Sequence, residues 1–133
     1  MKLYDTEGNL ISIRINPKDY EIRDKSKSGV QKEIGVLLKN RFPMCIILEE
    51  WQIPGKSGMT FDFIVLPEKL AIEVQGRQHY DFVKHFHRNI DGFKKQKERD
   101  KKKKEWCNVN GFSLYEIENE SDFINAFGEK NGK

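Results

Sequence analysis

Three patterns of apolar and polar residues follow one another in the first half of the chain. In residues 2–15, KLYDTEGNLISIRI, they alternate singly on both sides of Glu7-Gly8-Asn9, which predicts a β-hairpin. From Ser26 to Phe42 the apolar residues recur at helical spacing and stop before Pro43, so an amphipathic helix is expected there. Short apolar runs at 44–53, 60–66 and 70–76 then predict three strands.

The second half of the chain returns to helical spacing. Residues 89–110 predict a long helix with Asp100 and Cys107 on its inner stripe, closed by Gly111. FSLYEI, residues 112–117, reads as a last strand, and 121–130 as a short helix capped by Ser121. The apolar aromatic residues are expected in the core; they are Trp51, Trp106, Phe112 and Phe123.

This element order predicts an α/β fold in which helices flank a mixed sheet of about four strands. At 133 residues we expect one domain, 1–133, with a core at 29–117 and a hairpin at 1–20 extending the sheet. The composition, 37% hydrophobic and 34% charged, is typical of a globular protein. No apolar run reaches the roughly 18 residues of a membrane span, so a cytoplasmic protein without a membrane partner is expected. Cys45 and Cys107 are expected to be reduced.

The positive charge is concentrated in the long helix. The net charge is only +3, yet eight of the eleven residues from Lys94 to Lys104 are Lys or Arg. Such a block favours a polyanionic partner, although a solvated helix face is the common alternative.

Glu73 interrupts the apolar run LAIEVQG, where a buried charge requires a partner. A tight turn at 67–69 makes the strands of Asp62 and Glu73 neighbours, so the two carboxylates are expected near each other. Glu33, at the margin of the first helix's apolar stripe, is expected to reach the same place. Converging oxygen ligands of this kind suit Mg²⁺ or Mn²⁺.

These residues resemble the PD-(D/E)XK nuclease superfamily. The likeness runs from Gly29 to Ile117: a helix with Glu33, MTFDF with Asp62, then IEVQG with Glu73 and Gln75. The GRQHY loop and the RDKKK stretch of the basic helix are similar to the phage-type, very-short-patch-repair-like branch.

The resemblance implies a restriction-endonuclease-like αβββαβ core with an N-terminal hairpin. It implies Asp62 and Glu73 as metal ligands, Glu33 as a supporting carboxylate, and Gln75 in place of the motif lysine. A glutamine amide orients water or lends its oxygen to an ion but carries no charge. The expected nucleic-acid-binding residues are Arg77, His79, Tyr80, Lys95, Arg99, Lys102 and Lys103.

The function expected from this resemblance is a Mg²⁺-dependent endodeoxyribonuclease of phage or mobile-element type. It would cut duplex or branched DNA as a homodimer, without a small-molecule cofactor. The alternative is a catalytically silent nuclease-fold module that binds nucleic acid through its lysine helix.

Two other interpretations of the site residues stay open. Asp62 and Glu73 can be structural ion-pair partners of Arg99 or Lys103. A zinc site is a weaker alternative, with His79, His85, His87 and Cys107 as its ligands.

Overall fold

The computed structural model describes residues 1–16, 18, 29–75 and 90–128. The strands and helices follow in the order β1 (Lys2–Tyr4), β2 (Leu10–Ser12), α1 (Gly29–Arg41), β3 (Ile46–Gln52), β4 (Thr60–Leu66), β5 (Leu70–Val74), α3 (Ile90–Asn110), β6 (Ser113–Ile117) and α4 (Glu120–Phe127). The elements expected from the hydrophobic pattern are confirmed.

The four strands β3 to β6 form one mixed sheet in the order β3-β4-β5-β6. β3, β4 and β5 pair antiparallel through short connections, whereas β6 pairs parallel with β5. A parallel neighbour requires a crossover, and α3 lies in the segment that connects these two strands. The α/β class with a mixed four-stranded sheet is therefore confirmed.

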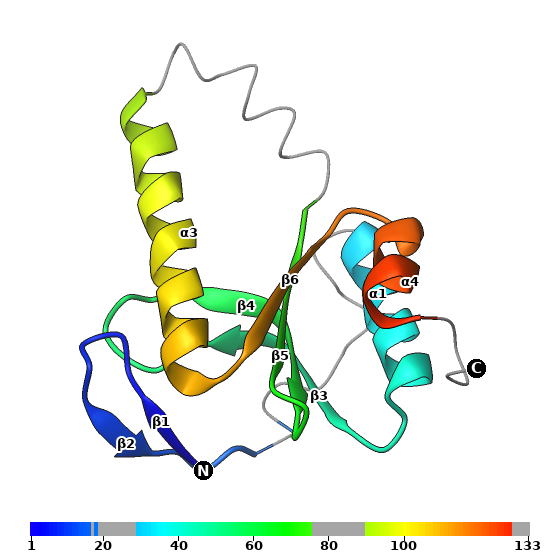
Figure 1. Ribbon diagram of the computed structural model, residues 1–133, viewed down its shortest axis with the longest axis horizontal. Coiled ribbons are helices and arrows are strands. Elements are labelled where there is room, and N and C mark those ends of the chain that lie inside the picture. Colours follow the sequence, from blue (N-terminus) through cyan, green and yellow to red (C-terminus); the bar gives the residue numbers. More distant parts are fainter. Residues whose placement is uncertain (17, 19–28, 76–89, 129–133) are drawn as a thin grey trace.

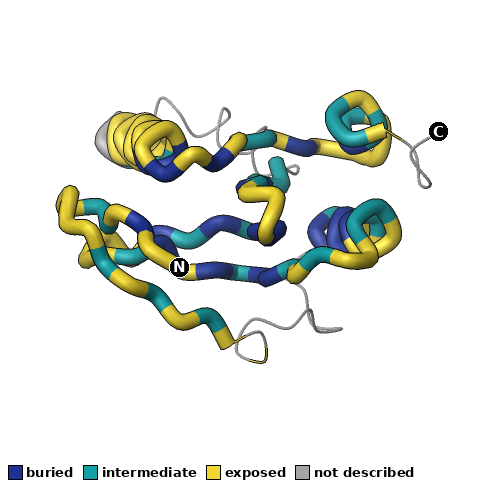
Figure 2. The backbone as a smooth tube through the Cα atoms, turned by 60° about the horizontal axis from the view of Figure 1, so that its bottom comes forward, coloured by how far each residue is buried: buried dark blue, intermediate teal, exposed yellow. Residues whose placement is uncertain are grey.

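Helices cover both faces of the sheet, as Figure 1 shows. α1 and α4 pack together on one face over Phe63, Val65 and Ile72. α3 lies on the other face, where its Trp106 and Cys107 join a second apolar cluster. In Figure 2 the buried segments are the strands and the helix turns that face them, while most of α3 is exposed. The four aromatic residues expected in the core are buried: Trp51, Trp106, Phe112 and Phe123.

The N-terminal hairpin β1-β2 is a separate two-stranded sheet, so the expectation that it extends the main sheet is wrong. It is fastened to the end of α3 by buried polar groups: Asn110 Oδ1 accepts from Tyr4 N at 2.7 Å, and Trp106 Nε1 donates to Tyr4 O at 2.8 Å. Leu3 enters the α3-side core. The backbone N–H and C=O of Tyr4 are thus satisfied by side chains of α3 and not by a strand of the main sheet.

Three local expectations have clear outcomes. Gly111, with a φ of 74°, follows the last residue of α3 and closes the helix as expected. The cap of α4 is Asn119 and not Ser121, because Asn119 Oδ1 accepts from Asp122 N at 2.9 Å. Asp100 is exposed and accepts from Gln96 Nε2 at 3.2 Å, so it does not belong to the inner stripe of α3.

The remaining general expectations concern the cysteines and the membrane. Both cysteines are free thiols, Cys107 buried and Cys45 half-buried. Across the described ranges no helix has the length and apolar content to cross a bilayer.

Candidate active site

The strand register places three acidic residues at neighbouring backbone positions across the sheet. β4 and β5 pair Phe63 with Ile72, which sets Asp62 opposite Glu73 at the next position. β3 and β4 pair Glu49 with Phe63 and Trp51 with Phe61, so Glu50 stands opposite Asp62 on the other side. The expectation that Asp62 and Glu73 meet is thus confirmed at the level of register.

Both carboxyl groups of the central pair are held by neighbours. Asp62 Oδ2 accepts from the backbone N–H of Val74 at 2.7 Å. Glu73 Oε1 accepts from Lys103 Nζ of α3, and these two side chains are only 14% and 16% exposed. The Lys103 ammonium also lies 5.7 Å from the centre of the Phe61 ring. Glu73 therefore has the lysine partner that the structural interpretation predicted, whereas Asp62 is held mainly by a backbone donor.

Burial and mutual repulsion govern the protonation of this pair. Burial raises the pKa of Asp62, and the Val74 N–H opposes that rise. Burial, reinforced by the negative charge of Asp62, raises the pKa of Glu73 from 4.5 to about 7, although Lys103 opposes it. The two carboxyl groups are close enough to share a hydrogen bond. Within the described part of the chain, the ionised trio of Asp62, Glu73 and Lys103 carries a net negative charge, which favours a further cation.

Glu33 does not contribute the third carboxylate. It is exposed on α1, and it lies two residues, or about 200° around the helix, from the buried Gln31. The expectation that it reaches the site is corrected, because the buried stripe of α1 runs through Gln31, Ile34 and Leu38 instead.

The residues that sequence reasoning missed are Gln31 and Glu50. Gln31 Nε2 donates to Glu49 Oε2 at 2.8 Å and to Glu50 Oε1 at 3.0 Å, which links α1 to β3. Glu50 adopts a φ of 53°, a left-handed conformation that is rare for a residue with a side chain. Its negative charge also raises the pKa of Asp62. Gln31 stands three and seven residues before Ile34 and Leu38 and so shares their helical face, but a polar side chain at that position does not mark the inward face by itself.

Gln75 lies just beyond β5, at the edge of the sheet beside α4. Its backbone N–H donates to Ile117 O at 2.9 Å, and the residue lines a shallow hollow with Tyr115, Asp122 and Asn125. Its role toward an ion remains a prediction.

The expected nucleic-acid-binding residues fall into three groups. Arg77, His79 and Tyr80 lie outside the described residues. Lys95, Arg99 and Lys102 are exposed on α3, while Lys103 turns inward to Glu73.

The zinc alternative gains nothing from the part of the chain that the structure describes. His79, His85 and His87 fall outside it, and within it no group of three His, Cys, Asp or Glu side chains is arranged to hold a metal ion.

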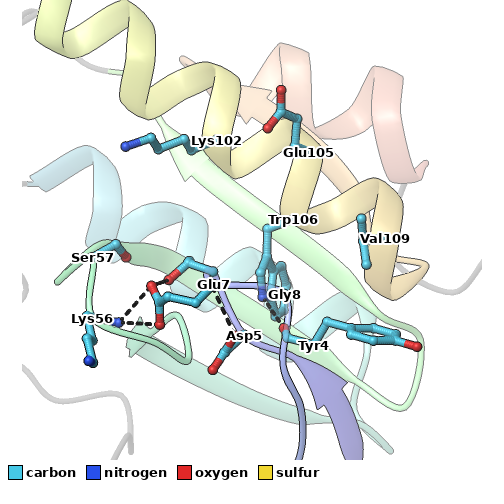
Figure 3. Close-up of a pocket in the computed structure, with 11 residues that line it drawn as sticks. Tyr4, Asp5, Glu7, Gly8, Lys56, Ser57, Lys102, Glu105, Trp106 and Val109 are labelled. Atoms are coloured by element: carbon cyan, nitrogen blue, oxygen red, sulfur yellow. Dashed lines mark hydrogen bonds between the residues drawn. The ribbon is translucent and has the colours of Figure 1, made fainter.

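A groove lies between the hairpin tip, the β3–β4 loop and α3. Figure 3 shows Lys102 reaching out from α3 over this groove and Trp106 pointing down to the hairpin. The loop that forms its floor is clamped: Thr6 N donates to Pro54 O at 3.0 Å, and Lys56 N donates to Glu7 Oε1 at 3.1 Å. Lys102 therefore lines this groove, whereas its neighbour Lys103 contacts Glu73.

The chain is similar to uncharacterized proteins of viruses. It is 31% identical over 117 residues to the uncharacterized protein 307L of Invertebrate iridescent virus 6, covering 76% of this chain and 59% of that protein. It is 42% identical over 48 residues to the uncharacterized protein 033L of Invertebrate iridescent virus 3, covering 36% of this chain and 25% of that protein. It is 46% identical over 50 residues to the uncharacterized protein 094L of Frog virus 3 (isolate Goorha), covering 37% of this chain and 32% of that protein.

The chain thus spans between a quarter and about three fifths of the length of these relatives. No family model matches the chain. No solved structure matches it either.

Proposed function

We propose that this protein is a Mg²⁺-dependent endodeoxyribonuclease with a restriction-endonuclease-like core. The observation that carries the proposal is the partly buried pair Asp62 and Glu73, set opposite each other on β4 and β5 beside Lys103. The order α1, three antiparallel strands, α3 and a parallel β6 supports it, because it agrees with the expected αβββαβ core. The basic surface of α3 beside the pair suits a polyanionic substrate.

The donor set fits a hard divalent cation. Mg²⁺ is commonly bound through one or two carboxylates, with water and substrate phosphate completing its ligands. Asp62 and Glu73 would hold it, and Mn²⁺ would bind the same oxygen ligands. Such an ion would supply a nucleophilic water and polarise the phosphoryl oxygen.

The protein's own groups have the remaining tasks. The Val74 N–H fixes the carboxylate of Asp62, and β5 presents Glu73 beside it. Exposed Lys95, Arg99 and Lys102 of α3 would neutralise the DNA backbone, with Arg77, His79 and Tyr80 as further proposed contacts. Because one such acid pair lies among the described residues of each chain, cutting both strands would favour a homodimer.

The viral source of the relatives is compatible with a virus-encoded or mobile-element enzyme. Their descriptions assign no activity, so DNA as the substrate rests on the site and on the basic helix. An enzyme of this kind would work in the cytoplasm of an infected cell.

A plasmid-cleavage assay tests the proposal. Supercoiled DNA is incubated with the protein in Mg²⁺, Mn²⁺ or EDTA, and nicked and linear products are followed on a gel. Asp62→Asn is expected to lower the cleavage rate by at least about 100-fold, because Asp62 would hold the ion that stabilises charge in the reaction, and loss of such stabilisation costs about that much in kcat. Glu33→Gln, which removes an exposed acid, is the matched control and is expected to cleave normally. Equal cleavage by the wild type and Asp62→Asn would contradict the proposal.

A second candidate is a catalytically silent module that binds nucleic acid. The Lys103–Glu73 ion pair favours this candidate, because Lys103 neutralises one of the two acids, Glu73, without a metal. This candidate predicts salt-dependent DNA binding with no cleavage in Mg²⁺ or Mn²⁺.

A further inference from the structure

Lys103 differs from every other basic residue of its block. Among residues 94–104 of α3, the other seven lysine and arginine side chains are exposed. Lys103 alone is largely buried, and its ammonium contacts Glu73. The positive charge of Lys103 is therefore directed into the protein, whereas the neighbouring basic side chains are exposed.

Helical geometry explains the inward direction. Lys103 shares one face of α3 with Trp106, Cys107 and Asn110, at spacings of three, four and seven residues. These three residues are buried against the sheet and the hairpin. The Lys103 stem packs near Phe61, and its ammonium reaches past that ring to the acid pair.

The ammonium is held by charge and is not enclosed. Lysine has a flexible four-carbon stem and three rotatable donors, so its head changes partners by rotamer changes alone. Lys103 retains 16% exposure, and both its chain neighbours, Lys102 and Lys104, face solvent. Rotamer changes of this side chain would therefore carry its ammonium from Glu73 toward solvent without a change in the backbone.

We infer that Lys103 is an exchangeable counter-ion of the acid pair: a divalent cation displaces its ammonium from Glu73, and the released ammonium then contacts a DNA phosphate. This inference rests on the proposed function, since it requires that the acid pair bind metal. The two cations share the negative charge of one carboxylate, so the binding of either one at Glu73 is expected to weaken the binding of the other. The displaced charge becomes available beside the basic surface of α3, and metal and DNA therefore reinforce each other's binding.

Mn²⁺ binding in the absence of DNA tests the competition directly. The free Mn²⁺ signal is titrated by electron paramagnetic resonance at pH 8 with the wild type, Lys103→Gln and Lys104→Gln. Lys103→Gln is expected to bind Mn²⁺ about tenfold more tightly, a typical coupling between two sites, because no ammonium has to leave. Lys104→Gln removes the same charge from the next, exposed residue and controls for general electrostatics. It is expected to change the affinity less than about twofold at moderate ionic strength.

The outcomes separate this inference from the proposed function. Mn²⁺ binding of equal or weaker affinity in Lys103→Gln overturns the inference and leaves the metal site standing. No Mn²⁺ binding by the wild type and by both variants overturns the inference and the proposed metal site together. Near-ultraviolet circular dichroism verifies the fold, and Lys103→Met, which keeps the apolar stem, replaces Lys103→Gln if that variant does not fold.

DNA affinity supplies an independent readout. Fluorescence anisotropy of a labelled duplex is measured with Ca²⁺ and with EDTA, and the gain in affinity caused by the cation is compared. The gain is expected to shrink about fivefold in Lys103→Gln and to persist in Lys104→Gln. An unchanged gain in Lys103→Gln overturns the release of the lysine to phosphate.

Discussion

Replacement of Glu73 by glutamine is expected to stabilise the metal-free protein at alkaline pH. The fold raises the pKa of Glu73 from 4.5 to about 7, so the folded protein binds this proton more tightly than the unfolded chain does. The stabilisation by the protonated form is complete below pH 4.5 and is lost as the pH rises through about 7. Because one pKa unit corresponds to about 1.4 kcal/mol, the ionised carboxylate costs up to about 3 kcal/mol at pH 8.

Glu73→Gln removes this cost and keeps a hydrogen-bond acceptor for Lys103. Lys103 also keeps a carboxylate nearby, because Asp62 lies beside residue 73 and interacts with the charge of Lys103. The pKa of about 7 already includes the attraction of Lys103, so we expect a net gain of about 1 to 3 kcal/mol at pH 8. The lower figure applies where the amide hydrogen-bonds less well than the protonated carboxyl group. For a domain of this size that corresponds to a rise in Tm of roughly 4 °C per kcal/mol.

Thermal and urea unfolding in EDTA at pH 5, 6.5 and 8, followed by circular dichroism, measure the effect. The stability difference between Glu73→Gln and the wild type is expected to be small at pH 5 and largest at pH 8. Glu33→Gln, the same change at an exposed acid, serves as the control and is expected to show no such trend. A Glu73→Gln variant that is less stable than the wild type at pH 8, or a difference independent of pH, would refute the reasoning.

Two further predictions concern local structure. Gly55→Ala is expected to destabilise the protein by about 2 kcal/mol in urea unfolding, because Gly55 has a φ of 124° and an added Cβ would lie 2.1 Å from Thr6 Oγ1 and 2.9 Å from Thr6 N. Gly58→Ala, at a φ of 73° with nothing within 4 Å, is the comparison and is expected to cost only about 1 kcal/mol; equal losses would argue against the close contact. Asn119→Ala is expected to cost about 1 kcal/mol by removing the cap of α4, whereas Ser121→Ala is expected to change stability by less than half of that. The same unfolding assay decides between the two capping residues.

Local patterns predicted the strands and helices well because each element carries its own periodicity. β4 was predicted at residues 60–66 and is observed at Thr60–Leu66, since TFDFIVL is apolar, β-branched and bounded by turn residues. The cap of α4 was misplaced because Asn119 and Ser121 are both good capping residues, and their sequence spacing does not rank them. The sequence predicted the hairpin but not its separation from the main sheet, because Asn110, which binds the hairpin's backbone, is more than 100 residues away in the chain.

In the candidate site, too, local sequence patterns predicted some residues, and only the fold placed the others. That Glu73 needs a partner followed from one acid in an apolar run, and the short turn at 67–69 made Asp62 its neighbour. Which side chains of α1 face the sheet depends on the rotation of the helix about its axis. The apolar residues of α1 are only weakly segregated to one face, so the sequence did not exclude Glu33 from the site. The sequence did not predict Glu50 as a site residue, because its place beside Asp62 depends on the register of β3 with β4.

The amino-acid sequence by itself determined the element order, the α/β class, the basic helix and the need to compensate a buried carboxylate, since these follow from residue type and local spacing. Only the tertiary structure decided that the compensating group is Lys103, that Gln31 and not Glu33 faces inward, and that the hairpin stands apart from the main sheet. Those choices depend on how packed elements are rotated and aligned, and they bring together residues whose separation in the chain carries no record of their contact.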